Sequence, residues 1–182
     1  DNIILETIKR VDKVIFISSW LKSYFINKGG ENIKNSAVIY NGCNQKHFYP
    51  HLKSVNNKIK LVTHHWSDNW LKGFDIYQAI DEYLENNDKF EFTYVGRYSS
   101  LYTPQNTTIV SPLHGKALGD ELRKHDIYVT ASRHEPCGMH HIEGACSGLP
   151  VLYHNDGGGI VEGCIQHGEK FCDFEEFLYK LE

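Results

Sequence analysis

The sequence has no long apolar run, no paired cysteine motif and no large excess of charge of either sign. No segment approaches the roughly 18 consecutive apolar residues of a membrane-spanning helix, and the first ten residues lack the apolar core of a secretion signal. The five cysteines are odd in number and show no CxxC spacing. This usage predicts reduced thiols and a cytoplasmic protein rather than a secreted disulfide framework.

The formal net charge is only −4 at pH 7, so no basic field predicts binding to nucleic acid or to a membrane surface. Partners must therefore be argued from individual sites. The 182 residues are enough for one domain with a sizeable core. The chain begins with Asp rather than Met, and we expect a fragment or a processed product.

Short β-branched and aromatic runs alternate with amphipathic segments, which is typical of β/α units around a mainly parallel sheet. We expect strands at residues 14–18, 37–40, 59–64, 90–95, 107–110, 127–131 and 150–153. We expect helices after Ser18 or Ser19 (stopped by Gly29 and Gly30), after Asp75, at 119–125, at 140–147 and over the last ten residues.

Polar and turn-forming residues at 41–58 predict a linker. Residues 59–182 contain a complete β/α alternation, which predicts an α/β domain with a doubly wound parallel sheet. Residues 1–48 form only a short β-α-β piece, too small to bury a core of its own. If that piece packs in another domain, Trp20, Phe25 or their neighbours should form an exposed apolar patch or be covered by other protein surface.

Unusual residues cluster in loops that follow predicted strands, where open parallel sheets bind ligands. In the loop and helix HEPCGMHHIE, Glu135 and Glu143 lie eight positions apart and can face one crevice. Backbone N–H groups between them favour an anion at a helix N-terminus, and Gly138 leaves room for a phosphate. Carboxylates bind neighbouring hydroxyls strongly. The arrangement suits a ligand with hydroxyls at both ends and phosphate in the middle.

The stretch EPCGMHHIE matches the E-x7-E motif, and the chain resembles retaining glycosyltransferases with the GT-B fold, in the family called glycosyl transferases group 1. The likeness covers nearly the whole chain and extends to the stretches VIFISSWLKSYF, VIYNGCNQKHFYP, LKGFD, GACSGLPVL and GGGIVE. The resemblance implies that 59–182 is a Rossmann-like nucleotide-sugar donor domain. It also implies that 1–48 is the end of the N-terminal acceptor domain with the interdomain linker.

The resemblance implies roles for residues at matching positions. Glu135 would contact hydroxyls of the donor sugar, Glu143 would bind the ribose, and Lys72 would neutralise the departing diphosphate. The other implied donor contacts are Gly138, Met139 and His140 for phosphate and sugar, and Pro112 and Leu113 for the nucleobase.

One departure from the family pattern concerns an arginine. The family usually reads G-R-x-x-x-x-K-G, whereas this chain reads THHWSDNWLKG without an arginine. His65 or Asn69 can occupy part of that space, or Arg97 from the next loop can take the role. We favour Arg97.

The expected reaction is transfer of a sugar from a nucleotide-diphosphate sugar to an acceptor, with retention at the anomeric carbon and without a protein nucleophile. Preorganised cations and N–H dipoles stabilise the charge that develops on the leaving diphosphate. The sequence contains no D-x-D, so we expect Lys72 and the helix N-terminus to replace a metal, and we expect no cofactor. The implied process is polysaccharide or glycoconjugate synthesis.

The acceptor, a glycan or lipid-linked glycan, would bind through a missing N-terminal domain, as would any membrane, and this chain alone is expected to be inactive. Three alternatives stay open at this stage. The chain is a nucleotide-binding module without activity, a sugar-nucleotide epimerase of the same fold, or a zinc-binding interaction domain. The zinc ligands would be His134, Cys137 and His140 or His141, although adjacent histidines make poor geometry.

Overall fold

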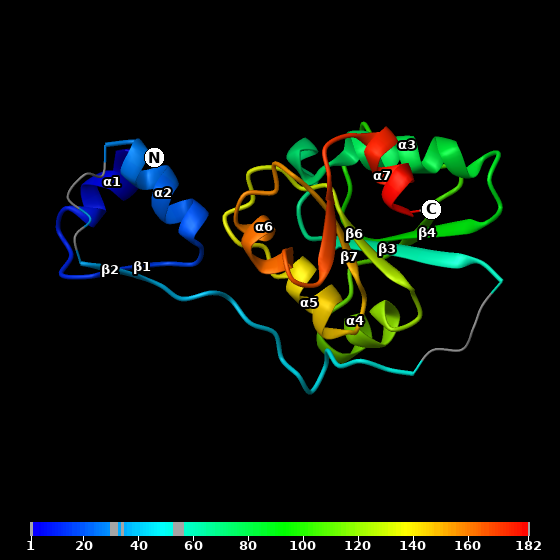
Figure 1. Cartoon of the computed structure of the whole chain (residues 1–182), viewed down its shortest axis with the longest axis horizontal. Helices are drawn as coiled ribbons and strands as arrows, with labels where there is room; N and C mark the ends of the chain where they lie inside the picture. The colour runs from blue at the N-terminus through cyan, green and yellow to red at the C-terminus, as the bar shows by residue number, and fades with distance from the viewer. Residues whose placement is uncertain (1, 30–32, 34, 53–56, 182) are drawn as a thin grey trace.

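A six-stranded parallel sheet forms the centre of the larger part of the chain (Figure 1). The computed structural model describes residues 2–29, 33, 35–52 and 57–181. The strand order is β5-β4-β3-β6-β7-β8, and every neighbouring pair is parallel. The strands are β3 (Ile59–His65), β4 (Phe90–Gly96), β5 (Thr108–Val110), β6 (Ile127–Thr130), β7 (Val151–His154) and β8 (Gly168–Phe171). The predicted α/β class with a doubly wound parallel sheet is confirmed.

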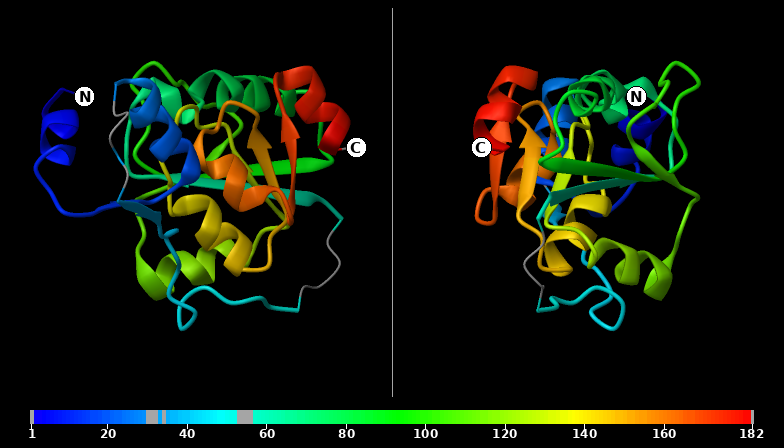
Figure 2. Two further views of the ribbon diagram at one scale, coloured as in Figure 1. Left: turned by 60° about the vertical axis from the view of Figure 1, so that its left-hand side comes forward. Right: turned by 90° about the vertical axis from the view of Figure 1, so that its right-hand side faces the viewer.

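Helices cover both faces of this sheet, as Figure 2 shows. Along β3, Leu61 belongs to one apolar core together with Phe74 and Tyr77, whereas Val62 belongs to a second core with Leu118. Successive residues of a strand point to opposite faces of the sheet, so two adjacent apolar residues pack in two different cores. The first face carries α3 (Phe74–Leu84) and α7 (Phe174–Leu181), and the second carries α4 (Gly115–Leu122), α5 (His140–Cys146) and α6 (Gly159–Cys164).

The strand order reverses between β3 and β6. The chain proceeds outward from β3 through β4 to β5, and then crosses back so that β6 pairs with β3, with Val62 opposite Tyr128. Loops leaving the two strands turn in opposite directions at such a point and open a crevice at the carboxyl ends. The fold therefore places its ligand-binding crevice beside His65 and Thr130, the last residues of these strands.

The N-terminal segment forms a small unit of its own. It consists of α1 (Asn2–Ile8), β1 (Val14–Phe16), α2 (Ser19–Asn27) and β2 (Ser36–Val38), with β1 and β2 parallel. As predicted, Ser18 caps α2, because its hydroxyl accepts a hydrogen bond from the N–H of Leu21 at 3.0 Å. Gly30 of the expected helix stop and residues 53–56 of the expected linker lie outside the described residues. The domain boundaries at 48 and 59 stay a prediction.

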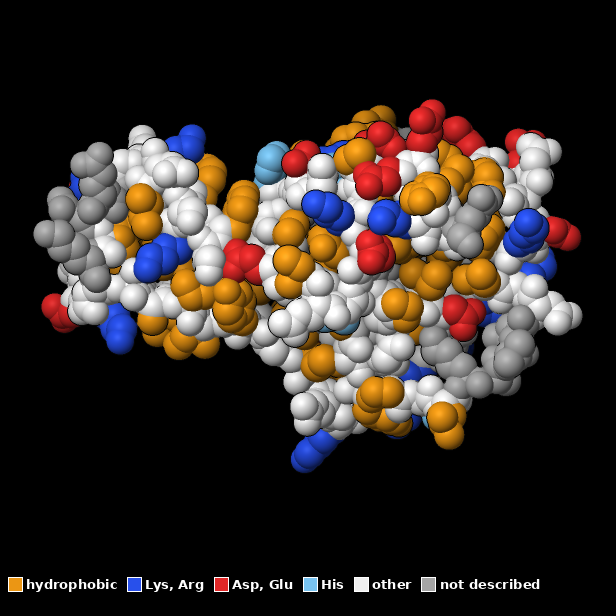
Figure 3. Space-filling model, viewed as in Figure 1, with side chains coloured by type: hydrophobic (Ala, Val, Ile, Leu, Met, Phe, Trp, Pro, Cys, Tyr) orange, Lys and Arg blue, Asp and Glu red, His pale blue; other side chains and the backbone are white. Residues whose placement is uncertain are grey.

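Apolar side chains gather on the surface of this N-terminal segment (Figure 3). Ile3, Ile15 and Ile39 are 83%, 57% and 58% exposed, whereas Phe25 is only 5% exposed and packs within the segment. The segment therefore exposes apolar side chains while Phe25 is covered within it, and the packing of this surface in another domain stays a prediction. In the described ranges, no helix combines the length and the apolar character needed to cross a bilayer.

Candidate functional site

A cavity of about 280 Å³ lies at the carboxyl ends of β3 and β6, where the strand order reverses. Every site residue predicted from the sequence lines it, with the exception of Arg97, Pro112 and Leu113. The lining residues are His64, His65, Trp66, Ser67, Lys72, Glu135, Gly138, Met139, His140 and Glu143.

Lys72 reaches the cavity from a short 3₁₀ turn, Trp70–Lys72, that ends at Gly73. Gly73 has a φ of +94°, and a Cβ atom there would collide with Ala131 directly after β6. Glycine is therefore required on two grounds, backbone conformation and close approach. The Lys-Gly element brings the turn after β3 against the loop after β6.

Lys72 forms an ion pair with Glu135 across these two loops. The two side chains are 19% and 18% exposed, so the ion pair is mostly buried but remains accessible to solvent. Their charges offset one another in this arrangement. An anionic ligand that enters the cavity must therefore compete with Glu135 for the ammonium of Lys72.

Backbone contacts with the glycine run before α6 fix the loop around Glu135. Glu135 forms an isolated parallel bridge with Gly158, and the N–H of Gly159 donates to the carbonyl of Glu135 at 2.8 Å. The hydroxyl of Ser18 donates to the carbonyl of Pro136 at 2.5 Å. The glycine run before α6 thus acts as a scaffold for the loop that carries Glu135.

Gly138 separates the side chains of Glu135 and His140. A Cβ atom at Gly138 would lie 2.5 Å from the imidazole of His140 and 3.2 Å from Cγ of Glu135. The first distance is shorter than real contacts, so any side chain here would displace His140. The glycine therefore leaves room for two cavity-lining side chains, in addition to the predicted room for a phosphate.

Glu143 is held by His64, in a contact that the sequence did not predict. Its Oε2 lies 2.8 Å from Nε2 of His64, and Nδ1 of His64 lies 3.0 Å from the hydroxyl of Tyr128. His64 and Tyr128 are 4% and 0% exposed. The His-His doublet at the end of a predicted strand was the only sequence signal for this contact.

Two further buried histidines, His65 and His140, pack edge to face with ring centroids 4.7 Å apart. Nε2 of His65 lies 2.8 Å from the hydroxyl of Tyr77, and Nε2 of His140 lies 2.9 Å from Oγ1 of Thr130. Burial lowers the pKa of both histidines well below the ordinary value. The charge of Lys72 lowers the pKa of His65 further, and the neighbouring His65 lowers that of His140 further. Both rings are therefore neutral at pH 7.

Three residues predicted for the site, Arg97, Pro112 and Leu113, do not line the cavity. Arg97 is exposed, and its guanidinium carbon lies 5.8 Å from the ring centroid of Trp66, which lines the cavity. Trp66 also stacks on His114 at 4.2 Å. Pro112 is exposed and Leu113 packs partly against the second core, both in the loop between β5 and α4. The roles assigned to these three residues stay predictions.

The zinc alternative finds no ligand set in the part of the chain that the structure describes. There, no group of three or more His, Cys, Asp or Glu side chains is placed to hold a metal ion. The ring of His134 stacks on Trp20, and His140 bonds to Thr130. Cys137 is buried.

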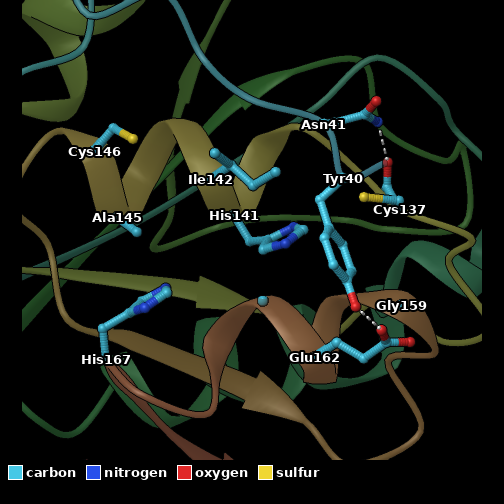
Figure 4. Close-up of a pocket in the computed structure, with 11 residues that line it drawn as sticks. Tyr40, Asn41, Cys137, His141, Ile142, Ala145, Cys146, Gly159, Glu162 and His167 are labelled. Atoms are coloured by element: carbon cyan, nitrogen blue, oxygen red, sulfur yellow. Dashed lines mark hydrogen bonds between the residues drawn. The ribbon is translucent and has the colours of Figure 1, made fainter. Parts of the chain in front are cut away.

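The N-terminal segment is docked beside the site through Glu162 and the linker (Figure 4). The carboxylate of Glu162 accepts hydrogen bonds from the hydroxyl of Tyr40 at 2.8 Å and from the N–H of Trp20 at 2.5 Å. The amide of Asn41 donates to the carbonyl of Cys137 at 3.0 Å. Tyr40, Asn41, Cys137 and Glu162 border a second cavity, of about 300 Å³, between the linker, α5 and α6. The linker thereby contacts the loop that begins at Glu135.

Comparison with known proteins establishes the fold. No family model matches the chain, and no curated protein matches it. Among solved structures, it is similar to sucrose-phosphate synthase from Thermosynechococcus elongatus, with 19% identity, 97% of this chain and 51% of that chain covered, and a TM-score of 0.74. The chain has the Rossmann-like half of a GT-B fold.

Two other similar structures are those of WaaG and HepE. WaaG, a glycosyltransferase involved in lipopolysaccharide biosynthesis, is 14% identical over 86% of this chain and 48% of its own, with a TM-score of 0.66. Anabaena HepE in complex with UDP and glucose is 20% identical over 82% of this chain and 46% of its own, with a TM-score of 0.63. The chain thus spans about half the length of these proteins.

Proposed function

We propose that this chain carries the nucleotide-sugar site of a glycosyltransferase, which moves a sugar from a nucleoside-diphosphate donor to an acceptor with retention. The supporting observation is that Lys72, Glu135 and Glu143 line one cavity at the strand-order reversal. These three residues come from two loops and one helix, and they supply one cation and two carboxylates. The fold shared with WaaG and HepE supports the same assignment.

The proposed ligand lies with its diphosphate near Lys72, its sugar near Glu135 and its ribose near Glu143. Charged acceptors bind hydroxyl groups more strongly than neutral ones, which suits the two carboxylates to the two sugar rings. The cavity of about 280 Å³ is at the lower end of ordinary small-molecule sites. In this proposal the diphosphate and the adjoining parts of both sugars occupy the cavity, and the base extends toward Pro112 and Leu113.

In the proposed reaction, the bond between the anomeric carbon and the diphosphate oxygen breaks, and the diphosphate leaves with the electron pair. An acceptor hydroxyl then bonds to the same face of the carbon, and its proton passes to the leaving diphosphate. Lys72 stabilises the growing negative charge once it has exchanged Glu135 for the phosphate. Neither Glu135 nor Glu143 is assigned as a nucleophile.

We propose that the acceptor binds to a separate acceptor-binding domain, which acts together with this chain. The acceptor class we propose is a glycan or a lipid-linked glycan, in polysaccharide or glycoconjugate synthesis in the cytoplasm. We expect neither a metal nor another cofactor, because Lys72 and the backbone N–H groups at Gly138 to His140 replace a cation.

The donor assignment is tested by calorimetric titration of ADP, GDP and UDP into wild type, Lys72→Ala and Glu143→Ala, with and without EDTA. We expect at least one nucleotide to bind wild type equally in both buffers, and each variant to bind it roughly tenfold or more weakly, since hydrogen bonds to charged groups are the strong ones. Lys116→Ala and Glu91→Ala are matched controls, because both side chains are exposed. Equal binding by wild type and Glu143→Ala would remove the ribose assignment.

Retention is tested with the nucleotide sugar that binds best and an acceptor-binding domain added. Proton NMR of the product reports its anomeric configuration, and the donor configuration should be preserved. Without acceptor, release of nucleoside diphosphate should be slow. Formation of an altered sugar in that acceptor-free sample would instead identify the epimerase alternative.

A further inference from the structure

The hydrogen-bond network behind Glu143 runs from Tyr128 through His64 to the carboxylate. Both nitrogens of the His64 ring have partners, Tyr128 at 3.0 Å and Glu143 at 2.8 Å, so the ring cannot turn without breaking one bond. The side chains of His64 and Glu143 are 5% and 16% exposed. Both residues line the cavity, and the carboxylate is the more exposed of the two.

The direction of each hydrogen bond follows from the chemistry of the groups. The Tyr128 hydroxyl already accepts the backbone N–H of His64 at 3.2 Å, and burial raises the pKa of Tyr128 well above its ordinary value, which keeps the phenol protonated. Its own proton is donated to Nδ1 of His64 at 3.0 Å, because the alternative acceptor, the carbonyl of His64, lies farther away at 3.5 Å. With Nδ1 as acceptor, a proton lies on Nε2, and Nε2 donates it to the carboxylate of Glu143.

Three separate elements at the crevice supply these residues. His64 lies on β3, Tyr128 lies on β6, and Glu143 lies on α5. Because β3 and β6 are hydrogen-bonded neighbours, with Val62 opposite Tyr128, the position of the phenol is set by the sheet itself. A glutamate side chain loses considerable rotamer freedom when a ligand binds it, and prior fixation removes that loss from the binding step.

The other charged and titratable groups around His64 are engaged elsewhere. Lys72 pairs with Glu135. The neutral ring of His140 lies 6.2 Å from that of His64 and bonds to Thr130, while His65 bonds to Tyr77. Among the described residues, His64 is the hydrogen-bond partner of the Glu143 carboxylate, and only Oε2 is engaged. The second oxygen, Oε1, is thus available to a ligand.

We propose that His64, oriented by the hydroxyl of Tyr128, is the positioning residue that fixes Glu143 for recognition of the ribose hydroxyls of the donor. The inference rests on the proposed function, because it takes a nucleoside diphosphate as the ligand. His64 itself touches no reacting atom in this scheme. It acts through Glu143, and its loss lowers discrimination between ribose and deoxyribose.

The test measures the affinity ratio between a nucleoside diphosphate and its 2′-deoxy counterpart, for ADP, GDP and UDP. Wild type should prefer the ribonucleotide by roughly ten- to hundredfold, the range for one hydrogen bond to a charged group. His64→Leu should reduce the ratio to about threefold or less. His64→Gln should restore most of it, because the glutamine amide reaches the position of Nε2 and donates to Glu143. Tyr128→Phe should fall between wild type and His64→Leu.

Each outcome has a distinct meaning. A folded His64→Leu that keeps the wild-type ratio overturns the role of His64, and a His64→Gln that behaves like His64→Leu does so as well. If His64→Leu does not fold, the glutamine and phenylalanine variants still decide. A wild type that binds none of the three diphosphates overturns the proposed function, and this inference with it. Glu143→Ala supplies the reference for complete loss of discrimination.

A measurement without any ligand checks the network itself. Long-range proton-nitrogen NMR distinguishes the two neutral tautomers of an imidazole. At pH 7.5, His64 should carry its proton on Nε2, and the Tyr128→Phe variant should show a change at Nδ1. The opposite tautomer of His64 in wild type would contradict the direction of donation toward Glu143.

Discussion

The carboxylate of Glu162 accepts a hydrogen bond from the hydroxyl of Tyr40 at 2.8 Å, which joins α6 to the segment directly after β2, 122 residues earlier in the chain. The same carboxylate accepts the backbone N–H groups of Ser19 and Trp20 at 3.0 and 2.5 Å. These N–H groups lie in the first turn of α2, where intrahelical partners are absent and an anion is favoured. Glu162 therefore fixes the N-terminal segment on the donor domain.

Glu162→Ala should loosen this docking, because three hydrogen bonds to one charged group are lost together. We expect a cost of about 3 kcal/mol to docking, on the scale of charged hydrogen bonds. Small-angle X-ray scattering should show a larger radius of gyration, and limited proteolysis should cut faster within residues 41–52. Glu175→Ala, in an exposed position of α7, is the control and should leave both unchanged. An unchanged scattering profile for Glu162→Ala would show that other contacts hold the N-terminal segment on the donor domain without Glu162.

Gly73→Ala should be a strongly destabilising single-methyl addition at the site. Gly73 combines a φ of +94° with a collision between the added Cβ and Ala131, whereas Gly29 has a φ of +102° and open space. We expect losses of about 3 kcal/mol for Gly73→Ala and about 1 kcal/mol for Gly29→Ala in urea unfolding. Nucleotide affinity should fall only for Gly73→Ala, since Lys72 is displaced. Equal losses would mean that the close approach to Ala131 has no cost.

Stability should fall on acidification because of His141. Burial lowers the pKa of His141 from 6.5 to about 4, with a further contribution from the charge of His167. Below pH 6.5 His141 binds a proton in the unfolded chain but stays unprotonated in the folded chain. The stability that neutral His141 contributes is therefore fully present above pH 6.5 and is lost as the pH falls toward 4. By pH 5 the loss from this residue is about 2 kcal/mol.

The check compares the free energy of unfolding at pH 7 and pH 5 for wild type, His141→Leu and His51→Leu. His51 is exposed and serves as the control. The other buried histidines contribute to the acid sensitivity of all three proteins. His141→Leu should therefore show a pH 5 loss smaller than that of wild type by about 2 kcal/mol, with the control unchanged. Equal losses in wild type and His141→Leu would contradict the neutral burial of this ring.

Arg97→Ala should weaken binding of nucleoside diphosphate by about tenfold if Arg97 replaces the family arginine. Its guanidinium lies over Trp66 at the edge of the cavity, from which the side chain can turn toward a phosphate. Arg97→Lys should retain part of the affinity, because a lysine keeps the charge without the planar fork. Wild-type affinity in Arg97→Ala would remove this residue from the site.

The sheet was predictable because its strands carry dense local signals. The runs at 90–95 and 127–131 are β-branched and aromatic, and the structure places β4 and β6 there. Strand β8 was missed, because only Phe171 is buried in this edge strand. Helix α6 was missed because it begins in a glycine run and has six residues. The expected helix at 119–125 begins instead at Gly115.

The site was predictable to the extent that its residues share one loop or one short motif. Glu135, Gly138 and Glu143 lie within nine residues, and their common cavity follows from a strand-loop-helix unit. The bond between His64 and Glu143 joins residues 79 positions apart. It depends on β6 being the neighbour of β3, which no local pattern of residues specifies. The docking of Glu162 on Trp20 is non-local for the same reason.

A crystal structure of the chain with a bound nucleoside diphosphate is the most direct test of the donor-site assignment. The account predicts the diphosphate within hydrogen-bond distance of Lys72, with a ribose hydroxyl on the carboxylate of Glu143 and with the bond between Glu143 and His64 intact. A nucleotide seated instead in the cavity between the linker, α5 and α6, or one whose ribose faces away from Glu143, would contradict it.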